Sequence, residues 1–493
     1  MSEMALSSGR LLPETGVTVR MYNTGFGDCF LLAFPRGRER RPFYMLIDCG
    51  AHSQYGGGAK HTKRVVSDIR KATDGYLDIV VITHEHTDHL SGFHSAREDF
   101  EKFKIGEIWF AWTEDNRDPL VKDLDKHKAL ALRGLQAAHG KLKSLGSKEM
   151  ADNLQSLLGF YQLGRGLGIS TRNVRDNIES LVKKDKVRYL KPKRSPLPLP
   201  TVEGVRIFVL GPPENERFLL AADPTGSAGE VYEHDETNHP DDALASALVM
   251  DSSDVFSNDY SEFERSQPFA GNHRLPVSKV KSNKKSYGFF HDNYGFKKND
   301  AQKWRRIDES WLGASESLAL KLDSATNNTS LVLAIELGRN GKVLLFPGDA
   351  QVGNWRSWHD GGWSKENGLD EGEEITAADL LRRTVLYKVG HHGSHNATLR
   401  EQGLELMTSD ELTAMIPVDE RWARSRKPHA WKMPFSSMYD DLMQRTQGRI
   451  LRTDIGLAEP DRKTAAWKKF KKDAVVCRKN DRVHYVEINV SDD

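Results

Sequence analysis

The alternation of apolar and polar positions predicts short buried strands separated by turns and helices. Residues 17–34 have the pattern of two strands around a Gly-rich turn, and residues 43–50 that of a third strand. Apolar residues recur at a spacing near 3.6 over residues 61–75, which predicts a helix. Further strands are predicted over 76–83 and 104–113. Strands that alternate with helices indicate a layered α/β architecture.

The second half of the chain continues this pattern. Residues 204–215 predict a strand that runs into a turn, and residues 329–350 predict a hairpin around the polar turn "GRNG". Strands are also predicted at the start of residues 384–398 and within 411–419 and 448–456.

One large domain is expected over residues 17–460, interrupted by two insertions. The first covers about 113–200 and has a helical pattern. Within it, residues 121–195 carry 17 Lys and Arg against 7 Asp and Glu, so the segment is basic. Residues 461–493 are expected to form a basic C-terminal extension with a final strand.

The second expected insertion covers residues 213–325 and is rich in loops. Residues 213–263 carry 13 acidic residues and one Arg, whereas residues 270–306 are basic. Few aliphatic runs occur in either part, which predicts little regular structure.

Composition limits the class of protein. The chain has 493 residues, 38% hydrophobic residues and a net charge of +1, so it can bury a sizeable core and is not an overall polyanion binder. Its three cysteines, Cys29, Cys49 and Cys477, form no CxxC pair, which favours a reducing compartment. The sequence has no signal-peptide pattern and no apolar run of about 18 residues, so we expect a cytoplasmic protein that does not bind membranes.

Side chains that could bind a metal are concentrated in "DIVVITHEHTDHLSGF". Four side chains of metal-ligand type follow one predicted strand within six positions: His84, His86, Asp88 and His89. Neutral imidazoles and ionised carboxylates a few ångströms apart are what Zn²⁺ requires. The pattern therefore predicts a metal site.

Other predicted strands end in residues of the same kind. Asp349 follows "VLLFPG", the pair His391 and His392 follows "LYKVG", and Asp48 follows "YMLI". Four such strand ends that converge would form one site at the edge of a sheet. Taken alone, Asp349 or Asp48 is also consistent with an ordinary turn residue. Some further histidines have a weaker claim and are expected in loops: His52, His94, His395 and His429.

Together these motifs resemble those of metallo-β-lactamase-fold hydrolases. "HEHTDH" after an apolar strand resembles the HxHxDH signature of that family. "TGFGDCFLLAF…YMLIDCG", "NNTSLVLAIEL…VLLFPGDA" and "LYKVGHHGSHN" resemble motifs of one branch, the hydrolase domain of ComEC-type DNA-uptake proteins. The resemblance implies an α/β fold, a four-layer αββα sandwich, with large helical and loop insertions.

The resemblance also implies a site for two divalent ions, Zn²⁺ or Mn²⁺. His84 and His86 would bind one ion, and Asp88 and His89 the other. Asp349 would bridge the ions.

The pair His391 and His392 would supply the last ligand. We favour His391 as the ligand and His392 as a catalytic contact to substrate or transition state, with the reverse left open. Asp88 could also orient the attacking water. Asp48 would support the site from below, and Ser394 and His429 are candidate substrate contacts.

The chain departs from the family pattern at several points. Gly211 stands where many members have a further histidine ligand, so the first ion would lack a ligand, be held weakly, or take a ligand from an insertion. Phe26 and Cys29 replace the Gln and Ser of the "GQGDS" motif. The membrane-channel portion of the uptake proteins is absent from this sequence.

The resemblance and the predicted site together indicate metal-dependent hydrolysis by a metal-activated water. Our first hypothesis is a phosphodiesterase, in particular a nuclease, because the basic insertions could hold phosphates. Residues 287–298, "YGFFHDNYGFKK", suggest a stacking segment. Two alternatives remain: hydrolysis of a small phosphoester, and a regulatory or interaction protein with a degenerate metal site. Protein partners are left open.

Overall fold

The structure, a computed structural model, describes most of the chain in two compact units. The described residues are 11, 13, 15–36, 41–144, 148–163, 169–219, 221, 275, 277–296, 302, 305, 314–426 and 430–491. The core unit comprises residues 1–118, 159–235 and 324–493. The insert unit comprises residues 119–158 and 236–323.

The first sheet of the core unit has eight strands in the order β19-β20-β1-β2-β3-β4-β5-β8. Its strands are β1 (Val17–Tyr22), β2 (Phe30–Phe34), β3 (Phe43–Ile47), β4 (Tyr76–Ile82), β5 (Lys104–Ala111), β8 (Val187–Leu190), β19 (Val475–Lys479) and β20 (Arg482–Val490). Strands β3, β4, β5 and β8 pair in parallel, whereas β19, β20, β1, β2 and β3 pair antiparallel. The sheet is therefore mixed.

The second sheet also has eight strands, in the order β18-β17-β16-β15-β12-β11-β10-β9. Its strands are β9 (Leu197–Pro198), β10 (Val205–Gly211), β11 (Val332–Leu337), β12 (Lys342–Phe346), β15 (Thr384–Lys388), β16 (Thr413–Ile416), β17 (Ile450–Arg452) and β18 (Gly456–Leu457). The predicted hairpin around "GRNG" is confirmed, because β11 and β12 pair antiparallel across it.

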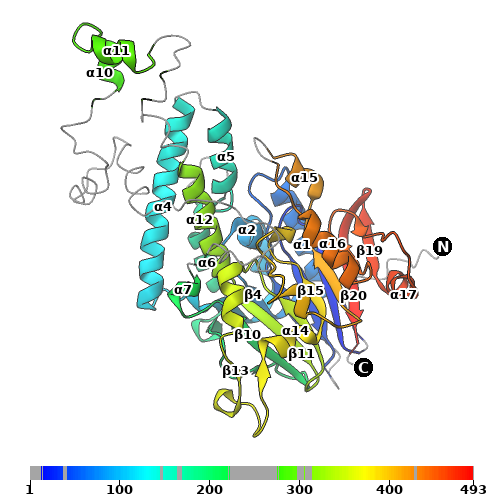
Figure 1. The fold of residues 1–493 in the computed structure, drawn as a ribbon. Coiled ribbons are helices and arrows are strands. Elements are labelled where there is room, and N and C mark those ends of the chain that lie inside the picture. The colour runs from blue at the N-terminus through cyan, green and yellow to red at the C-terminus, as the bar shows by residue number, and fades with distance from the viewer. Residues whose placement is uncertain are drawn as a thin grey trace. The chain divides into compact units, whose positions relative to one another are not determined.

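The two sheets share one apolar core. Alternate residues of both sheets contribute to it, such as Val19 and Ile79 from the first sheet and Ile335 and Leu386 from the second. Because strand side chains alternate between faces, the other residues of each strand point outward and need a cover of their own. The sheets therefore pack face to face (Figure 1).

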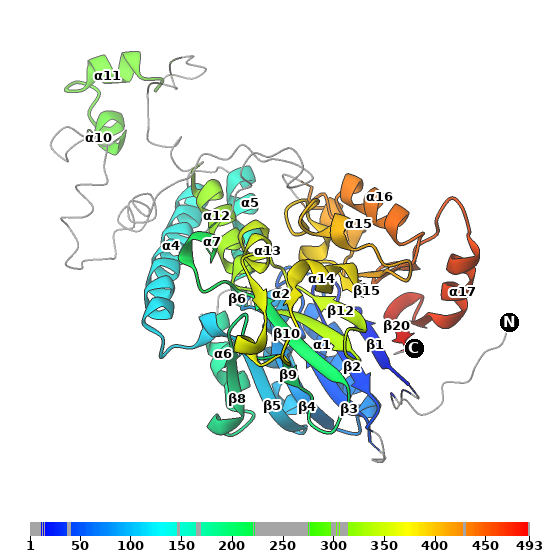
Figure 2. The same cartoon turned by 60° about the horizontal axis from the view of Figure 1, so that its bottom comes forward.

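Helices cover both outer faces. The first sheet packs against α1 (Gly58–Ala72), α2 (Thr87–Ser95), α3 (Arg97–Phe100) and α6 (Thr171–Glu179). The second packs against α13 (Val352–Trp358), α14 (Ala377–Arg382) and α16 (Ser436–Arg445). In Figure 2, α14 lies next to β12 of the second sheet. The predicted α/β class is confirmed.

The remaining short elements of the core unit lie in connections. They are β6 (Gln162–Leu163), β7 (Ile169–Ser170), β13 (Gly362–Trp363), β14 (Ile375–Thr376), α7 (Glu216–Leu219), α15 (Glu420–Arg424) and α17 (Ala465–Asp473). In the described part of the chain, no helix has both the length and the apolar character needed to cross a membrane.

The insert unit is helical where it is described. It contains α4 (Pro119–Ser144), α5 (Lys148–Leu158), α10 (Val277–Ser282), α11 (Gly288–Asn293) and most of α12 (Ala314–Asn328). Helices α4, α5 and α12 share a small apolar cluster that includes Leu135, Leu154 and Leu318. Most of the acidic stretch 213–263 lies outside the described residues.

The structure shifts two of the expected boundaries. Part of the expected insertion 113–200 belongs to the core unit, because α6 packs on the first sheet and β8 pairs with β5. The expected C-terminal extension 461–493 is an integral part of the scaffold, because β20 pairs with β1. Both segments are rich in charged residues, so a search for apolar runs did not indicate their strand pairing.

Candidate metal centre

The HxHxDH motif lies in the connection from β4 to α2. Strand β4 ends at Ile82 and α2 begins at Thr87, so His84 and His86 lie in the connection and Asp88 and His89 in the first turn of the helix. The backbone N–H of Thr87 donates to Phe160 O at 2.8 Å, which fixes the start of the helix. The four ligand-type side chains are almost fully buried, with exposed fractions of at most 1%.

Two other predicted strand ends reach the same place. Asp349 follows β12 after Gly348, whose φ is +56° and whose hypothetical Cβ would lie 2.9 Å from Thr83 Cβ. A side chain at Gly348 would therefore push the two strand ends apart. His391 and His392 follow β15 with φ angles of 43° and 52°. Non-glycine residues rarely adopt this conformation, which costs energy and is often found at functional sites.

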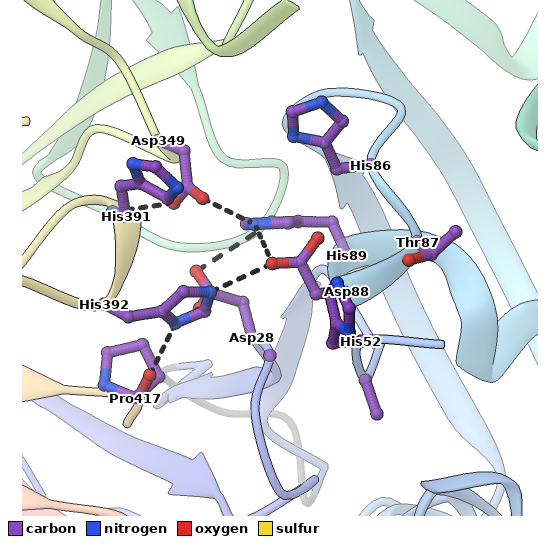
Figure 3. A network of polar contacts seen from close by, with 12 residues as sticks. Asp28, His52, His86, Thr87, Asp88, His89, Asp349, His391, His392 and Pro417 are labelled. Carbon is purple, nitrogen blue, oxygen red and sulfur yellow. Dashed lines mark hydrogen bonds and ion pairs between the residues drawn. The ribbon is translucent and has the colours of Figure 1, made fainter. Parts of the chain in front are cut away.

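Two groups of ligand-type side chains share Asp349, and a third group comprises Asp28, Asp48 and His89. In the first group, the ligand atoms of His84, His89 and Asp349 lie within 4.8 Å of one another, and in the second so do those of Asp88, Asp349 and His392. His89 Nε2 lies 3.1 Å from Asp349 Oδ2, and His392 Nε2 lies 2.9 Å from Asp88 Oδ2 (Figure 3). One carboxylate thus connects the two groups.

These distances fit the requirements of a divalent ion. Neighbouring ligand atoms of a tetrahedral zinc site lie about 3.4 Å apart, given zinc–ligand distances of about 2.1 Å. Asp88 Oδ1 is buried and has no hydrogen-bond partner among the described residues. A buried carboxylate oxygen of this kind is costly unless a cation or a donor satisfies it. The residues present therefore fit a metal ion.

The protonation states of His84, His86 and Asp88 fit as well. Burial lowers the pKa of His84 well below its usual value and that of His86 to about 3, so both rings offer a lone pair near neutral pH. Burial tends to raise the pKa of Asp88, but the charge of His89 and the hydrogen bond with His392 lower it below its usual range. Neutral imidazoles and ionised carboxylates are the states that bind metals.

His89 lies among several carboxylates. Burial tends to lower its pKa, but the carboxylates of Asp349, Asp28 and Asp48 outweigh burial and raise the pKa well above the usual value. A divalent cation near this ring would interact with the same carboxylates. The site is thus built to stabilise positive charge.

Asp48 orients His89. Its Oδ1 accepts a hydrogen bond from Thr83 N at 2.8 Å, and its Oδ2 accepts one from Thr83 Oγ1 at 2.6 Å. Oδ2 also lies 2.7 Å from His89 Nδ1. Because the carboxylate can only accept, we assign the hydrogen to Nδ1, which leaves Nε2 directed toward Asp349. Asp48 occupies the supporting position that the sequence suggested for it.

The two adjacent histidines have different surroundings. His392 Nδ1 lies 2.6 Å from Pro417 O, a carbonyl that can only accept, so Nδ1 carries a hydrogen and Nε2 lies next to Asp88. His391 Nδ1 lies 3.0 Å from Ser394 Oγ, and its ring remains 6% exposed. The geometry brings His392 into a candidate metal group and places His391 at its border, the reverse of the assignment we favoured from sequence.

The other predicted residues are less central. Ser394 is buried beside the ring of His391, so its hydroxyl positions that ring. His86 Nδ1 lies 3.1 Å from His84 Nε2 and so borders the first group. His429 lies outside the described residues. His52, expected in a loop, is in a loop but is 1% exposed.

Gly211 cannot be the site of a further ligand without a rearrangement. A Cβ built on Gly211 would lie 2.0 Å from Asn354 Oδ1. Asn354 donates through Nδ2 to Asn328 O and Ser330 O, both at 2.9 Å, so it is held in place. The position opposite Gly211 is therefore filled by an amide.

Two site residues were not identified from the sequence. Asp28 Oδ2 lies 2.5 Å from Lys388 Nζ, and that ammonium also lies 2.9 Å from Asp349 Oδ1. Burial tends to lower the pKa of Lys388, but Asp28 and Asp349 outweigh burial and raise it, so the side chain is charged. The sequence did contain a signal for both residues. Asp28 belongs to the "GFGD" turn, and Lys388 precedes the two histidines within "LYKVGHH".

Comparison with known proteins adds no family. No protein-family model matches the chain, and a search of curated proteins returns no match.

Proposed function

We propose that the chain is a metal-dependent hydrolase of phosphodiester bonds, with the fold and site of a metallo-β-lactamase. The observation that carries the proposal is Asp349, a carboxylate shared by two groups of buried ligand-type side chains. The face-to-face sheets with helices on both outer faces support the αββα assignment. A divalent ion bound here would lower the pKa of water and polarise the P=O bond.

Different side chains would bind the ions and orient the shared carboxylate. Asp349, His84 and His89 would hold one ion, and Asp88, Asp349 and His392 a second, with Zn²⁺ or Mn²⁺ as the candidates. The Lys388 ammonium pairs with Asp349 Oδ1, which leaves Oδ2 directed toward His89.

His391, the most exposed imidazole of the centre, would take part in proton transfer. Its Nδ1 contact with Ser394 leaves Nε2 as the second ring nitrogen, and burial lowers its pKa to about 4. The ring is thus neutral near pH 7 and can accept a proton or a hydrogen bond from water.

A matched pair of variants tests the proposal. Wild-type protein loaded with Zn²⁺ or Mn²⁺ should hydrolyse bis(p-nitrophenyl) phosphate and single-stranded DNA or RNA. Asp349→Asn should abolish turnover, because the amide keeps the shape but loses the shared charge. His94→Ala should retain turnover, because His94 lies near the end of α2 outside both groups. Turnover that survives Asp349→Asn, or that does not depend on metal, would refute the proposal.

A second candidate is a regulatory or interaction protein with a degenerate metal site. The observation that favours it is the Lys388 ammonium, which already neutralises Asp28 and Asp349. Elemental analysis of folded protein decides between the two: well under one ion per chain after dialysis against Zn²⁺ or Mn²⁺ would favour the second candidate.

The cellular location belongs to the same proposal. Cys29, Cys49 and Cys477 are free thiols. Free thiols are typical of reducing compartments, which supports a cytoplasmic enzyme.

A further inference from the structure

Five aromatic rings of the core unit form what we call the aromatic wall: Phe26, His52, Phe160, Trp422 and Trp431. Phe160 and Trp431 stack with centroids 5.6 Å apart and an interplanar angle of 17°. Phe26 lies 4.7 Å from Trp422, and Trp422 lies 5.6 Å from Trp431 nearly at right angles. The rings come from segments far apart in the sequence, so only the fold brings them together.

The aromatic wall borders the metal centre directly. Phe160 lies 5.3 Å from the ring of His86 and 6.5 Å from that of His391, and Phe26 lies 4.0 Å from that of His392. The carbonyl of Phe160 accepts the Thr87 N–H bond that fixes the start of α2. The aromatic wall and the HxHxDH motif are therefore held in one rigid arrangement, which favours a binding role.

Exposure differs along the aromatic wall. Phe26, His52 and Phe160 are buried, with exposed fractions of 0%, 1% and 3%. Trp422 and Trp431 are only partly buried, and the neighbouring Lys432 is exposed. The two tryptophans are therefore the partly exposed members of the aromatic wall.

The sequence around the two tryptophans is rich in basic residues. Residues 419–433 contain five Lys and Arg against two acids. Both acids are already engaged: Asp419 accepts from Tyr55 Oη at 2.7 Å, and Glu420 pairs with Arg424 and Arg452, each at 2.7 Å.

Arg426 adds a stacked cation, because its Cζ lies 4.1 Å from the centroid of Trp422. A surface with this charge repels a cationic ligand, although aromatic rings alone could bind one. Partly exposed tryptophans interleaved with basic residues match single-stranded nucleic acid, whose bases stack on rings while its phosphates attract Lys and Arg.

We propose that Trp422 and Trp431 form a stacking subsite for an unpaired base of single-stranded nucleic acid, positioned to place a neighbouring phosphodiester at the metal centre. This inference rests on the proposed hydrolase function and names its substrate class. A duplex keeps its bases stacked on one another, so single strands, loops and ends are the expected substrates.

Binding of uncleavable oligomers tests the subsite without turnover. The probes are fluorescein-labelled phosphorothioate dT15 and an abasic phosphorothioate of the same length, measured by anisotropy with the as-purified protein. Wild-type protein should bind dT15 about tenfold more tightly than the abasic probe, because base stacking on aromatic rings is sequence-tolerant but needs a base. Trp431→Leu and Trp422→Leu should lose this preference, whereas Trp431→Phe should keep most of it.

A variant outside the aromatic wall provides the control. Phe289 of α11 is 68% exposed and belongs to the insert unit, in the segment that sequence suggested for stacking. Phe289→Leu should leave the preference for dT15 unchanged. Loss of the preference in Phe289→Leu but not in Trp431→Leu would overturn the proposal.

Two further outcomes separate this subsite from the hydrolase proposal. Equal binding of both probes by the wild type, or displacement of dT15 by millimolar tetramethylammonium, would overturn the subsite even if bis(p-nitrophenyl) phosphate is hydrolysed. A clear base preference without metal-dependent ester hydrolysis would refute the hydrolase and retain the stacking surface.

Discussion

Lys388 and Asp28 form a buried ion pair, with Nζ 2.5 Å from Oδ2 and both side chains 2% exposed. The same ammonium contacts Asp349 Oδ1 at 2.9 Å, and the backbone N–H of His391 donates to that oxygen at 2.9 Å. Asp349 therefore has one oxygen fixed by protein donors and presents the other to His89. Lys388 and the His391 backbone N–H thus set the orientation of the carboxylate that two candidate metal groups share.

Replacing Lys388 with Met should strongly destabilise the metal-free protein. The substitution leaves Asp28 and Asp349 buried without their cation, and loss of one partner of a buried pair costs about 3–5 kcal/mol. Urea unfolding in EDTA measures this loss. Addition of Zn²⁺ should stabilise Lys388→Met more than the wild type, because the ion replaces the missing charge. An unchanged unfolding midpoint in EDTA would show that the ion pair is not needed for stability.

Asp48→Asn should weaken metal binding while it preserves the fold. Asp48 has a φ of 55°, a conformation that Asn tolerates, so the backbone should not change. The amide cannot accept from both Thr83 and His89 as the carboxylate does, and loss of such an orienting partner lowers metal affinity about 10–100-fold. Competition with a chromogenic chelator measures the affinity, and Glu366→Gln, on an exposed helix, is the matched control. Equal affinities would show that His89 does not need Asp48.

Substitutions of the two adjacent histidines should have different effects. His392→Gln should lower the number of bound ions, because its Nε2 lies beside Asp88 within a candidate metal group. His391→Gln should retain the ions but lower kcat, because His391 lies at the border of the site. Elemental analysis and steady-state kinetics on both variants separate these effects. The opposite pattern would restore the assignment suggested by sequence.

Gly211→Ala should destabilise the core unit. The added Cβ would lie 2.0 Å from Asn354 Oδ1, and overpacking of this kind costs about 1–3 kcal/mol. Gly56→Ala is the matched control, because a Cβ there has no heavy atom within 4 Å. Thermal unfolding should show a lower midpoint for Gly211→Ala only. Equal midpoints would mean that Asn354 moves without cost.

Asp78 should contribute an acid-sensitive part of the stability. Burial tends to raise its pKa, but hydrogen bonds from Arg41 and from Tyr44 N, with the charge of Arg36, lower it. Because the folded-state pKa is depressed, the contribution is fully present above the unfolded value of about 3.9 and is lost as pH falls through the folded value. The free energy of unfolding, measured with urea, should therefore fall less steeply from pH 7 to pH 3 for Asp78→Asn than for the wild type. At pH 7 the variant should be less stable by about 2 kcal/mol. Parallel pH profiles of the unfolding free energy for the variant and the wild type would contradict this role of Asp78.

The sequence indicated the ligand-rich strand ends because the signal there is local. His84, His86, Asp88 and His89 follow an apolar run within six positions, and Asp349 ends another such run. The α/β class followed from the same alternation of apolar strands and helices.

The missed residues depend on tertiary packing. Asp28 lies in a glycine turn, where a carboxylate is ordinary, and Lys388 ends a strand, where a lysine is usually solvated. Trp422 and Trp431 are nine positions apart, and nothing in their spacing indicates that Phe26 and Phe160 lie beside them. Such sites form only when the sheets and their connections meet.

The pairing of β20 with β1 delays completion of the first sheet during synthesis. In this pairing Val17 lies opposite Val490 and Tyr22 opposite Tyr485. One edge of β1 therefore stays unpaired until residues more than 450 positions later in the chain have been synthesised. Until then the emerging chain presents an unpaired, apolar strand edge, which other chains can recruit into aggregates. Truncation before Arg482 should therefore reduce the yield of dispersed protein even though the candidate metal centre lies upstream of the cut.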